Sequence, residues 1–331
     1  MRDHGGNLDE AIRCHGRAEE DWIDLSTGIN RQPYPVPPLP GTAWTALPTR
    51  KALAELHDAA RSAYSTSAGV LAVAGAQTAI QLIPHLSGPG RARILSPTYN
   101  EHAAALRAAG WQVDEVADLA ELAGADLAVV VNPNNPDGRS WPAEQLKELS
   151  SSVGRLVVDE SFVDVTPQLS LAPDLDVPGL LVLRSFGKFY GLAGLRLGFV
   201  LGSSADVGAL SAMAGPWPVS GAAIAIGCRA LADRAWTTAT RTRLTHDAAR
   251  LDRIAQSAGW RLAGGTPLFR LYETGDAKAA QSALAEHAIW SRIFPYSPGW
   301  IRLGLPGAEA EWTRIETAFG DLASLPRAGP Q

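Results

Sequence analysis

Short apolar runs alternate with helical segments through the middle of the chain, and this alternation limits the fold more than any other feature of the sequence. The run from Leu127 to Val131 contains only apolar side chains, which is typical of a strand buried on both faces of a parallel sheet. Segments with apolar residues at helical spacing separate the runs, near 76–86, 99–109, 118–123 and 142–151. We expect strands at 70–74, 93–96, 111–116, 127–131, 156–159, 179–184 and 195–201. The pattern predicts an α/β fold with a mostly parallel sheet.

The segments on either side of this region have different patterns. Prolines crowd residues 31–48, which predicts an extended connector without a helix. A helix is expected over 49–64, with Thr49 as its N-cap. From about residue 220, a long helical segment bent near 232–236 precedes short strands and further helices, an α+β arrangement. We predict three parts: an N-terminal arm over 1–40 that partly joins the small domain, a large domain over 41–222, and a small C-terminal domain over 223–331.

Composition excludes several classes of protein. An apolar share of 46% in 331 residues fits a globular protein rather than a disordered one. The net charge of −5 offers no attraction for phosphate backbones, so we expect no nucleic-acid partner. No apolar run approaches the ~18–20 residues that span a bilayer, so we expect no membrane association. The two cysteines lack metal-like spacing, and we expect no metal. The first residues lack the apolar core of a signal peptide, which favours a cytoplasmic location.

Polar residues follow the predicted strands, at the edge where open α/β sheets bind ligands. These residues lie directly after the strands and are Gly75 to Thr78, Pro97 to Asn100, Asn132 to Gly138, Asp159 with Glu160, and Ser185 to Lys188. The set contains a single lysine, Lys188. We therefore expect a ligand site at this edge that contains one amine.

Two of these segments resemble the fold-type I pyridoxal-phosphate (PLP) enzymes, the aspartate aminotransferase superfamily. They run from Asn132 to Gly138 and from Ser185 to Gly198, and the resemblance extends over nearly the whole chain. It implies the PLP-dependent transferase fold type I, in which a large domain with a mostly parallel seven-stranded sheet is joined to a smaller α+β domain. It also implies pyridoxal 5'-phosphate as the cofactor.

The resemblance also implies a role for each residue at this edge. Lys188 would form the Schiff base with the cofactor, because burial can lower the pKa of an amine. Asp159 would keep the pyridine nitrogen protonated, which makes the ring an electron sink. The other implied cofactor contacts are Asn135 to the ring 3-oxygen, Tyr99 stacked on the ring, and Ser185, Arg196 and the amides of Ala76 and Gln77 on the phosphate. Four alternatives stay open: Lys188 as a surface lysine, Asp159 as the cap of a turn, Tyr99 as a core residue, and the segment from Gly75 to Gln77 as an ordinary turn.

Within the superfamily, the chain is similar to the branch of histidinol-phosphate aminotransferases and cobalamin-pathway threonine-phosphate decarboxylases. Three features resemble the decarboxylases: the opening from His4 to Asn7, the segment from Leu25 to Asn30 ahead of the prolines, and Phe162. Aminotransferases usually place a tyrosine at the position of Phe162, where it hydrogen-bonds the ring 3-oxygen.

Six residues are implied to bind the substrate: His4, Gly5, Gly6, Asn7, Asn30 and Arg302. The two glycines let backbone amides approach an anion closely. Arg302 matches the family arginine that meets the substrate carboxylate. The alternatives are a frayed terminus for His4 to Asn7, a turn asparagine for Asn30, and a surface arginine on an edge strand for Arg302.

The resemblance implies decarboxylation of L-threonine O-3-phosphate to (R)-1-aminopropan-2-yl phosphate, a step of cobalamin biosynthesis. An aminotransferase acting on histidinol phosphate is the first alternative, because the same residues serve it. A non-catalytic protein that keeps the fold and binds the cofactor is the second. The resemblance also implies a homodimer. Leu47 stands where many relatives have a tyrosine that reaches the neighbouring subunit's cofactor phosphate, so that contact is not expected here.

Overall fold

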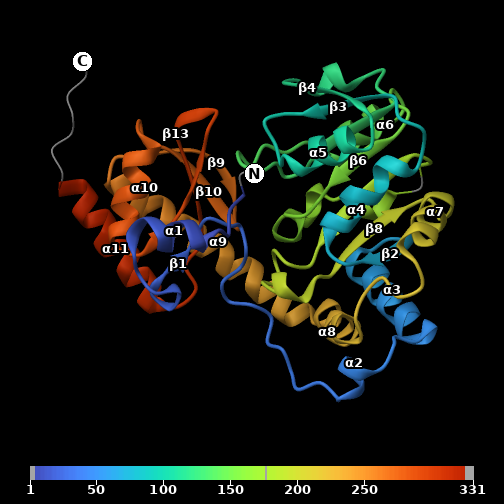
Figure 1. The fold of residues 1–331 in the computed structure, drawn as a ribbon, viewed down its shortest axis with the longest axis horizontal. Coiled ribbons are helices and arrows are strands. Elements are labelled where there is room, and N and C mark those ends of the chain that lie inside the picture. The colour runs from blue at the N-terminus through green and yellow to red at the C-terminus, as the bar shows by residue number, and fades with distance from the viewer. Residues whose placement is uncertain (1–3, 176, 325–331) are drawn as a thin grey trace. The chain divides into compact units, whose positions relative to one another are not determined.

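The computed structural model of the protein describes residues 4–175 and 177–324. Its internal contacts divide the chain into two compact units (Figure 1). The large unit comprises residues 33–238, and the small unit comprises the residues up to 32 together with those from 239 onward. Among the described residues, no helix combines the length and the apolar character that crossing a bilayer requires.

The large unit is built around a seven-stranded sheet with the order β2-β8-β7-β6-β5-β3-β4. Its strands are Gly69–Val73 (β2), Arg91–Leu95 (β3), Gln112–Val116 (β4), Leu127–Val131 (β5), Leu156–Asp159 (β6), Leu180–Ser185 (β7) and Gly198–Gly202 (β8). Neighbouring strands from β4 to β7 are parallel, whereas β8 runs antiparallel to both β7 and β2. The predicted mostly parallel sheet is confirmed.

Helices bury the apolar residues of the sheet. One core joins side chains of the strands to those of α4 (Ala76–Leu82), α5 (Glu101–Ala108) and α7 (Ser204–Ala214). The other helices of this unit are α2 (Thr42–Thr45), α3 (Arg50–Tyr64), α6 (Ala143–Ser150) and α8 (Gly221–Ala232). The predicted N-cap of α3 is confirmed, because Thr49 Oγ1 accepts a hydrogen bond from the amide of Ala52 at 3.1 Å. α3 packs on α8 at Gly227, where a Cβ would lie 2.8 Å from Leu56.

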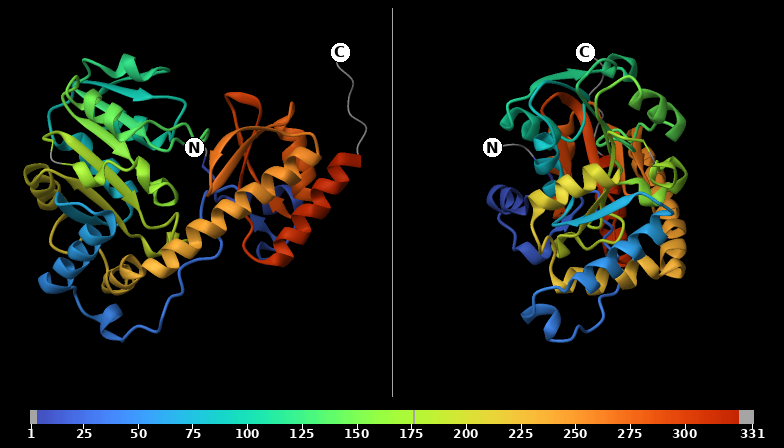
Figure 2. Two further views of the ribbon diagram at one scale, coloured as in Figure 1. Left: turned by 180° about the vertical axis from the view of Figure 1, so that it is seen from behind. Right: turned by 90° about the vertical axis from the view of Figure 1, so that its right-hand side faces the viewer.

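The small unit combines a four-stranded antiparallel sheet with helices and a short parallel pair. The sheet has the order β12-β13-β10-β9, and β1 pairs with β11. The elements are α1 (Leu8–His15), β1 (Ile23–Asp24), α9 (Arg234–Ser257), β9 (Arg261–Thr266), β10 (Phe269–Glu273), α10 (Ala277–Glu286), β11 (Ile289–Trp290), β12 (Arg292–Phe294), β13 (Ser297–Gly304) and α11 (Glu309–Ser324). α9 and α11 lie side by side (Figures 1 and 2), where Arg250 forms ion pairs with Glu309 and Glu316.

Three local predictions differ from the structure. The connector over 31–48 contains the short helix α2, because no proline interrupts residues 41–47. The strand expected over 195–201 begins at 198, after a 3-10 turn whose last backbone position, Arg196, has a φ of +54°. The helix expected over 118–123 is a 3-10 helix, Leu119–Leu122.

The unit boundaries also differ from the predicted domain boundaries at 40/41 and 222/223. The first lies at 32/33, because the amide of Tyr34 already donates to the carbonyl of Tyr190 in the large unit at 2.8 Å. The second lies at 238/239, within α9. It falls later than predicted because α8 packs on α3 and therefore stays with the large unit.

Candidate active site

A pocket of about 140 Å³ in the large unit is lined by all eight residues that the sequence predicts to contact the cofactor. These are Ala76, Gln77, Tyr99, Asn135, Asp159, Ser185, Lys188 and Arg196. Among the described residues that line the pocket, Lys188 and Arg196 are the cationic side chains and Asp159 is the carboxylate. The pocket can therefore hold an anion at one end and a cation or an N–H donor at the other.

The sheet topology explains why residues far apart in the sequence meet at this pocket. Asp159 and Ser185 are the last residues of β6 and β7, so they lie at the same edge of a parallel sheet. Tyr99 and Asn135 lie in the segments that follow β3 and β5. Arg196 instead precedes β8, and because β8 runs antiparallel to β7, its start lies at the edge where β7 ends.

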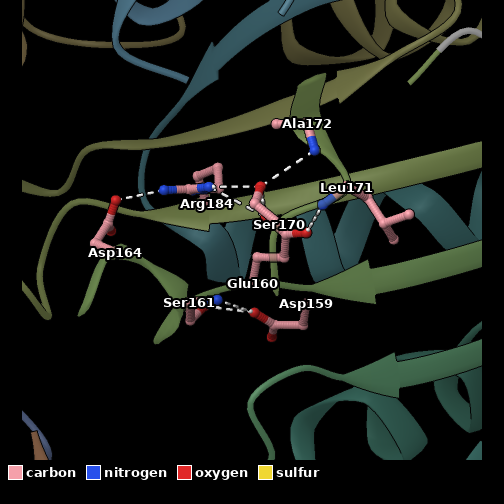
Figure 3. A network of polar contacts seen from close by, with 8 residues as sticks. All are labelled: Asp159, Glu160, Ser161, Asp164, Ser170, Leu171, Ala172 and Arg184. Atoms are coloured by element: carbon pink, nitrogen blue, oxygen red, sulfur yellow. Dashed lines mark hydrogen bonds and ion pairs between the residues drawn. The ribbon is translucent and has the colours of Figure 1, made fainter. Parts of the chain in front are cut away.

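Asp159 is held in one orientation by buried partners. His102 Nε2 lies 2.9 Å from Asp159 Oδ2, and the other carboxylate oxygen accepts bonds from the amide and the hydroxyl of Ser161 at 2.9 and 2.5 Å (Figure 3). Burial alone would raise the pKa of Asp159, but the hydrogen bonds from His102 and Ser161 outweigh it and hold the pKa below its ordinary value. The pocket therefore contains a carboxylate that is ionised at neutral pH.

The anion end of the pocket is formed where Gly75 meets Arg196. Gly75 has a φ of +79°, and a Cβ there would lie 2.8 Å from Nη2 of Arg196, so only glycine leaves room for the guanidinium. Arg196 Nη1 donates to the carbonyl of Ala193 at 3.1 Å, which fixes the direction of the side chain. A guanidinium, the hydroxyl of Ser185 and the backbone at the start of α4 form a donor set suited to a phosphate.

Lys188 and two aromatic residues line the rest of the pocket. The Lys188 ammonium lies 5.7 Å from the centre of the Phe162 ring, a cation–π distance. Tyr99 donates from its hydroxyl to Gln77 Oε1 at 3.3 Å, and its ring meets that of His102 edge-on at 6.2 Å. The pocket therefore has an amine beside the aromatic ring of Phe162, and Tyr99 as a second aromatic lining residue.

Part of the predicted substrate-binding set meets at Ser26 in the small unit. The amide of Gly6 donates to Ser26 Oγ at 2.7 Å, and Arg302 Nη2 donates to the Ser26 carbonyl at 2.5 Å. A Cβ at Gly5 would clash with that carbonyl, so the glycine permits the close approach. Ser26 is itself fixed by Asp24, whose Oδ1 accepts from the Ser26 amide and hydroxyl.

The other predicted substrate residues have separate surroundings. Asn30 is buried, and its Oδ1 accepts from the amide of Gln32 at 3.1 Å and from Arg243 Nη2 at 2.8 Å. His4 is exposed, and Asn7 precedes α1 without capping it through its side chain. Hydrogen bonds thus join Gly6 and Arg302 at Ser26.

Arg302 is a buried cation in an electropositive setting. Burial, together with the nearby charge of Arg292, lowers the pKa of Arg302 to about 10. Arg292 lies directly opposite it in the β12–β13 pairing. Like charges placed opposite each other destabilise a sheet, and an anion bound there would relieve the repulsion.

Comparison with known proteins identifies the family. Residues 44–316 match the family model of the class I and II aminotransferases. The chain belongs to this family. The match includes every residue of the large-unit pocket and also Arg302.

Two relatives and one solved structure describe its neighbours within the class I and II aminotransferase family. The chain is 44% identical to the threonine-phosphate decarboxylase of Pseudomonas aeruginosa over 96% of this chain and 97% of that protein. It is 35% identical to a histidinol-phosphate aminotransferase of Mycobacterium bovis over 72% of this chain and 66% of that protein. The structure of the histidinol-phosphate aminotransferase of Sinorhizobium meliloti in complex with pyridoxal-5'-phosphate superposes with a TM-score of 0.80, at 22% identity, over 98% of this chain and 95% of that one.

Sequence reasoning missed several partners of the site residues in this aminotransferase-family chain. His102 and Ser161 hold Asp159, and Ser26 and Arg243 hold Arg302 and Asn30. His102 lies in the first turn of α5, three residues after Tyr99. This helical spacing was a weak signal that the two side chains lie on the same side of the helix. Nothing near Ser26 or Arg243 along the chain pointed to their distant partners.

Proposed function

We propose that the chain is a pyridoxal-phosphate-dependent lyase that converts L-threonine O-3-phosphate to (R)-1-aminopropan-2-yl phosphate and carbon dioxide. The likeness to the P. aeruginosa threonine-phosphate decarboxylase carries this proposal, because it reaches 44% identity over 96% of this chain and 97% of that protein. The reaction would serve cobalamin biosynthesis, as the sequence resemblance implies.

The residues that line the pocket supply the charged and polar groups that the cofactor needs. Arg196, Ser185 and the amides of Ala76 and Gln77 would hold its phosphate. Asp159, kept ionised by His102 and Ser161, would accept the N–H of the pyridine ring at the other end. Tyr99 would stack on the ring, and Asn135 would donate to its 3-oxygen.

Each residue then has a defined part in the reaction. Pyridoxal phosphate, when bound, accepts into its ring the electron pair of the bond that breaks at the substrate Cα. Asp159 holds the proton on the ring nitrogen and so maintains the positive charge that attracts this pair. The substrate amine would take the place of Lys188 Nζ, which would then be free to donate a proton to Cα after carbon dioxide has left. Atoms balance, because the carboxylate leaves as carbon dioxide and one proton replaces it.

The residues predicted to bind the substrate would supply its anion contacts. Arg302 would bind the carboxylate, and the segment from His4 to Asn7 with Asn30 would bind the phosphate. Two anchors are needed because rotation about the N–Cα bond is otherwise free, and only the bond perpendicular to the ring breaks. Burial and the charge of Arg292 lower the pKa of Arg302, and an anionic ligand would favour its charged form.

Phe162 is the structural observation that favours decarboxylation over transamination. Its ring is buried and lines the pocket, so no hydroxyl at this position reaches the 3-oxygen of the cofactor ring. A histidinol-phosphate-type aminotransferase is the second candidate, supported by the M. bovis relative at 35% identity. A non-catalytic cofactor-binding protein is the least favoured reading, because Lys188 and Asp159 are both present in the pocket.

The decisive experiment incubates purified protein with pyridoxal phosphate and L-threonine O-3-phosphate and measures carbon dioxide and aminopropanol phosphate. A parallel sample receives histidinol phosphate and 2-oxoglutarate, and a third receives L-threonine. Carbon dioxide from the phosphorylated substrate alone supports the proposal. Glutamate formation without carbon dioxide would assign the chain the aminotransferase activity. The absence of product in every sample would indicate a non-catalytic cofactor-binding protein.

We further propose that the protein is a cytoplasmic homodimer with no nucleic-acid or membrane partner. Exposed apolar side chains support a contact between copies: Trp44 and Leu47 are 69% and 65% exposed beside α2, and Trp217 is 54% exposed ahead of α8. α2 packs on the start of α8, because a Cβ at Gly221 would lie 2.7 Å from the carbonyl of Ala43. The three side chains therefore belong to neighbouring elements.

A further inference from the structure

A buried ion cluster lies one residue away from two of the proposed cofactor contacts. Glu160 follows Asp159 at the end of β6, and Arg184 precedes Ser185 at the end of β7. Successive side chains of a strand point to opposite faces of a sheet, so Glu160 and Arg184 face away from the pocket. Figure 3 shows Glu160 directed toward Arg184, with Asp159 directed toward Ser161.

Arg184 joins two carboxylates in this cluster. Its Nη1 donates to Glu160 Oε2 at 3.1 Å, and its Nη2 donates to Asp164. The side chains of Arg184, Glu160 and Asp164 are 5%, 0% and 6% exposed, so these ion pairs are shielded from water. The guanidinium also lies 4.1 Å from the centre of the Tyr64 ring of α3.

The Glu160 carboxylate also accepts hydrogen bonds from the loop that follows β6. Its Oε2 accepts from the hydroxyl of Ser170 at 2.6 Å, and its Oε1 accepts from the amide of Leu171 at 2.7 Å. The Ser170 hydroxyl in turn accepts from the amide of Ala172, so the loop after β6 is tied to the same cluster (Figure 3). Each carboxylate and the guanidinium therefore has a fixed direction.

The cluster lies where the backbone pairing of β6 and β7 ends. The register pairs Asp159 with Leu183, and the amide of Glu160 makes a further bond to the Leu183 carbonyl at 2.9 Å. Beyond this bond, the Arg184 side chain also connects the two strand ends, through its hydrogen bond to Glu160. A buried ion cluster contributes little net stability compared with apolar side chains of the same volume, but it constrains geometry strongly.

We propose that Arg184 is a positioning residue for the cofactor: by joining Glu160 and Asp164 to the end of β7, it holds the Asp159 carboxylate and the Ser185 hydroxyl at a fixed separation. This inference rests on the proposed function, in which Asp159 and Ser185 contact the ring nitrogen and the phosphate. One rigid cofactor must meet both groups at once, so a small change in their separation weakens both contacts. Arg184 itself touches neither the cofactor nor the substrate.

The chain offers a matched control at the other end of the same strand. Arg155 precedes β6, and its Nη2 pairs with Asp206 of α7 at 2.7 Å. The side chains are 16% and 12% exposed, so this pair is also largely buried. Arg155→Met therefore removes an arginine ion pair from β6 without disturbing the strand ends at the pocket.

The experiment titrates pyridoxal phosphate into the wild type, Arg184→Met and Arg155→Met, and measures the dissociation constant by protein fluorescence and visible absorption. Thermal unfolding of each protein without cofactor reports the structural cost of each substitution. We expect both variants to unfold at lower temperature, and only Arg184→Met to bind the cofactor about tenfold or more weakly. Arg155→Met should bind it within about twofold of the wild type.

A coupling measurement separates positioning from general weakening. Ser185→Ala should weaken cofactor binding less in the Arg184→Met background than in the wild type, because the hydroxyl is then already misplaced. The proposal would be overturned if the two substitutions reduced the free energy of cofactor binding additively. It would also be overturned if Arg184→Met bound the cofactor as tightly as the wild type does. Arg184→Lys, which keeps the charge but not the two-pronged geometry, should recover only part of the affinity.

Asp164→Asn keeps the experiment informative if Arg184→Met does not fold. It preserves the shape of the cluster and removes one ion pair, and we expect weaker cofactor binding, whereas wild-type affinity would overturn the proposal. The titrations contain no amino-acid substrate, so they are independent of whether the chain decarboxylates. If Ser185→Ala and Asp159→Asn bind the cofactor as the wild type does, the proposed contacts fail rather than the role of Arg184.

Discussion

Each reactive group of the pocket owes its chemistry to a few atoms around it. Asp159 is ionised because His102 and Ser161 donate to it, although burial alone would favour its neutral form. Arg196 is placed by a glycine whose missing side chain leaves it room. Substitutions at this scale should therefore change one chemical step at a time.

Lys188→Ala should abolish turnover and leave some non-covalent binding of pyridoxal phosphate through Ser185, Arg196 and Asp159. The reason is that Lys188 is the lysine of the pocket, and no neighbouring group can replace its amine. Product formation and cofactor retention after gel filtration measure the two effects. Lys147→Ala, at an exposed ion pair on α6, is the control and should behave as the wild type. Near wild-type activity of Lys188→Ala would show that Lys188 is not the reactive amine of the site.

Asp159→Asn should reduce turnover nearly as much as Lys188→Ala does. An amide keeps the position but cannot stabilise the ring's positive charge, so the cost should be several kcal/mol of transition-state stabilisation. Steady-state kinetics of carbon dioxide release measures it. A loss under about tenfold, roughly 1.4 kcal/mol, would mean that Asp159 is not the partner of the ring nitrogen.

The same variant should alter the acid sensitivity of the protein without cofactor. The pKa of Asp159 is lower in the folded protein than its ordinary value of 3.8, so its ionised form stabilises the fold above that pH, and this contribution is lost as the pH falls through the folded value. The free energy of unfolding of the wild type should exceed that of Asp159→Asn most near neutral pH, and the difference should narrow below about pH 4. Urea unfolding at a series of pH values tests this, and a pH-independent difference would contradict it.

At the scale of elements, Gly6 and α1 are held by contacts with the rest of the small unit. α1 contributes to an apolar cluster with Trp22, Ala285 and Trp290, and the amide of Gly6 is bonded to Ser26. The segment from His4 to Asn7 therefore ends at an anchored helix, which suits a binding segment better than a frayed terminus does.

The double variant His4→Ala with Asn7→Ala should bind L-threonine O-3-phosphate much more weakly than the wild type does, whereas its binding of L-threonine should change far less. Removing the phosphate anchor also leaves the N–Cα rotation less constrained, so the share of abortive transamination should rise relative to decarboxylation. Both products and both substrates are measured for the variant and the wild type. His15→Ala, at the end of α1, which follows this segment, is the control. Equal losses for the two substrates would show that this segment does not bind the phosphate.

At the scale of the whole molecule, the exposed apolar residues of the large unit set an expectation for assembly. Trp44→Glu should weaken the proposed homodimer by about tenfold or more, because exposed aromatic residues dominate many interfaces and a buried carboxylate there lacks a partner. Analytical ultracentrifugation over a range of concentrations measures the dissociation constant. Tyr296→Ser, at a similarly exposed aromatic of the small unit, is the control. A wild type that sediments as a monomer at all concentrations would contradict the proposal.

Much of the fold could be predicted because its signals are local. The apolar run from Leu127 to Val131 indicates a strand from its own residues alone. Because such runs alternate with helices, a mostly parallel sheet is the arrangement that buries them. The carboxyl ends of parallel strands share an edge, so the order of Asp159 and Ser185 along the chain already placed them together. Their roles toward a cofactor stay predictions until the variants are measured.

Only the tertiary structure decided which distant residues became partners. His102 meets Asp159, Arg184 joins Glu160 to Asp164, and Arg302 bonds to Ser26 across 276 positions of the chain. The late boundary within α9 was also beyond the sequence, since the packing of α8 on α3 decides it. The physical reason is that secondary structure follows from the spacing of apolar residues along the chain, whereas the pairing of buried polar groups depends on strand register and helix packing, which no local spacing encodes.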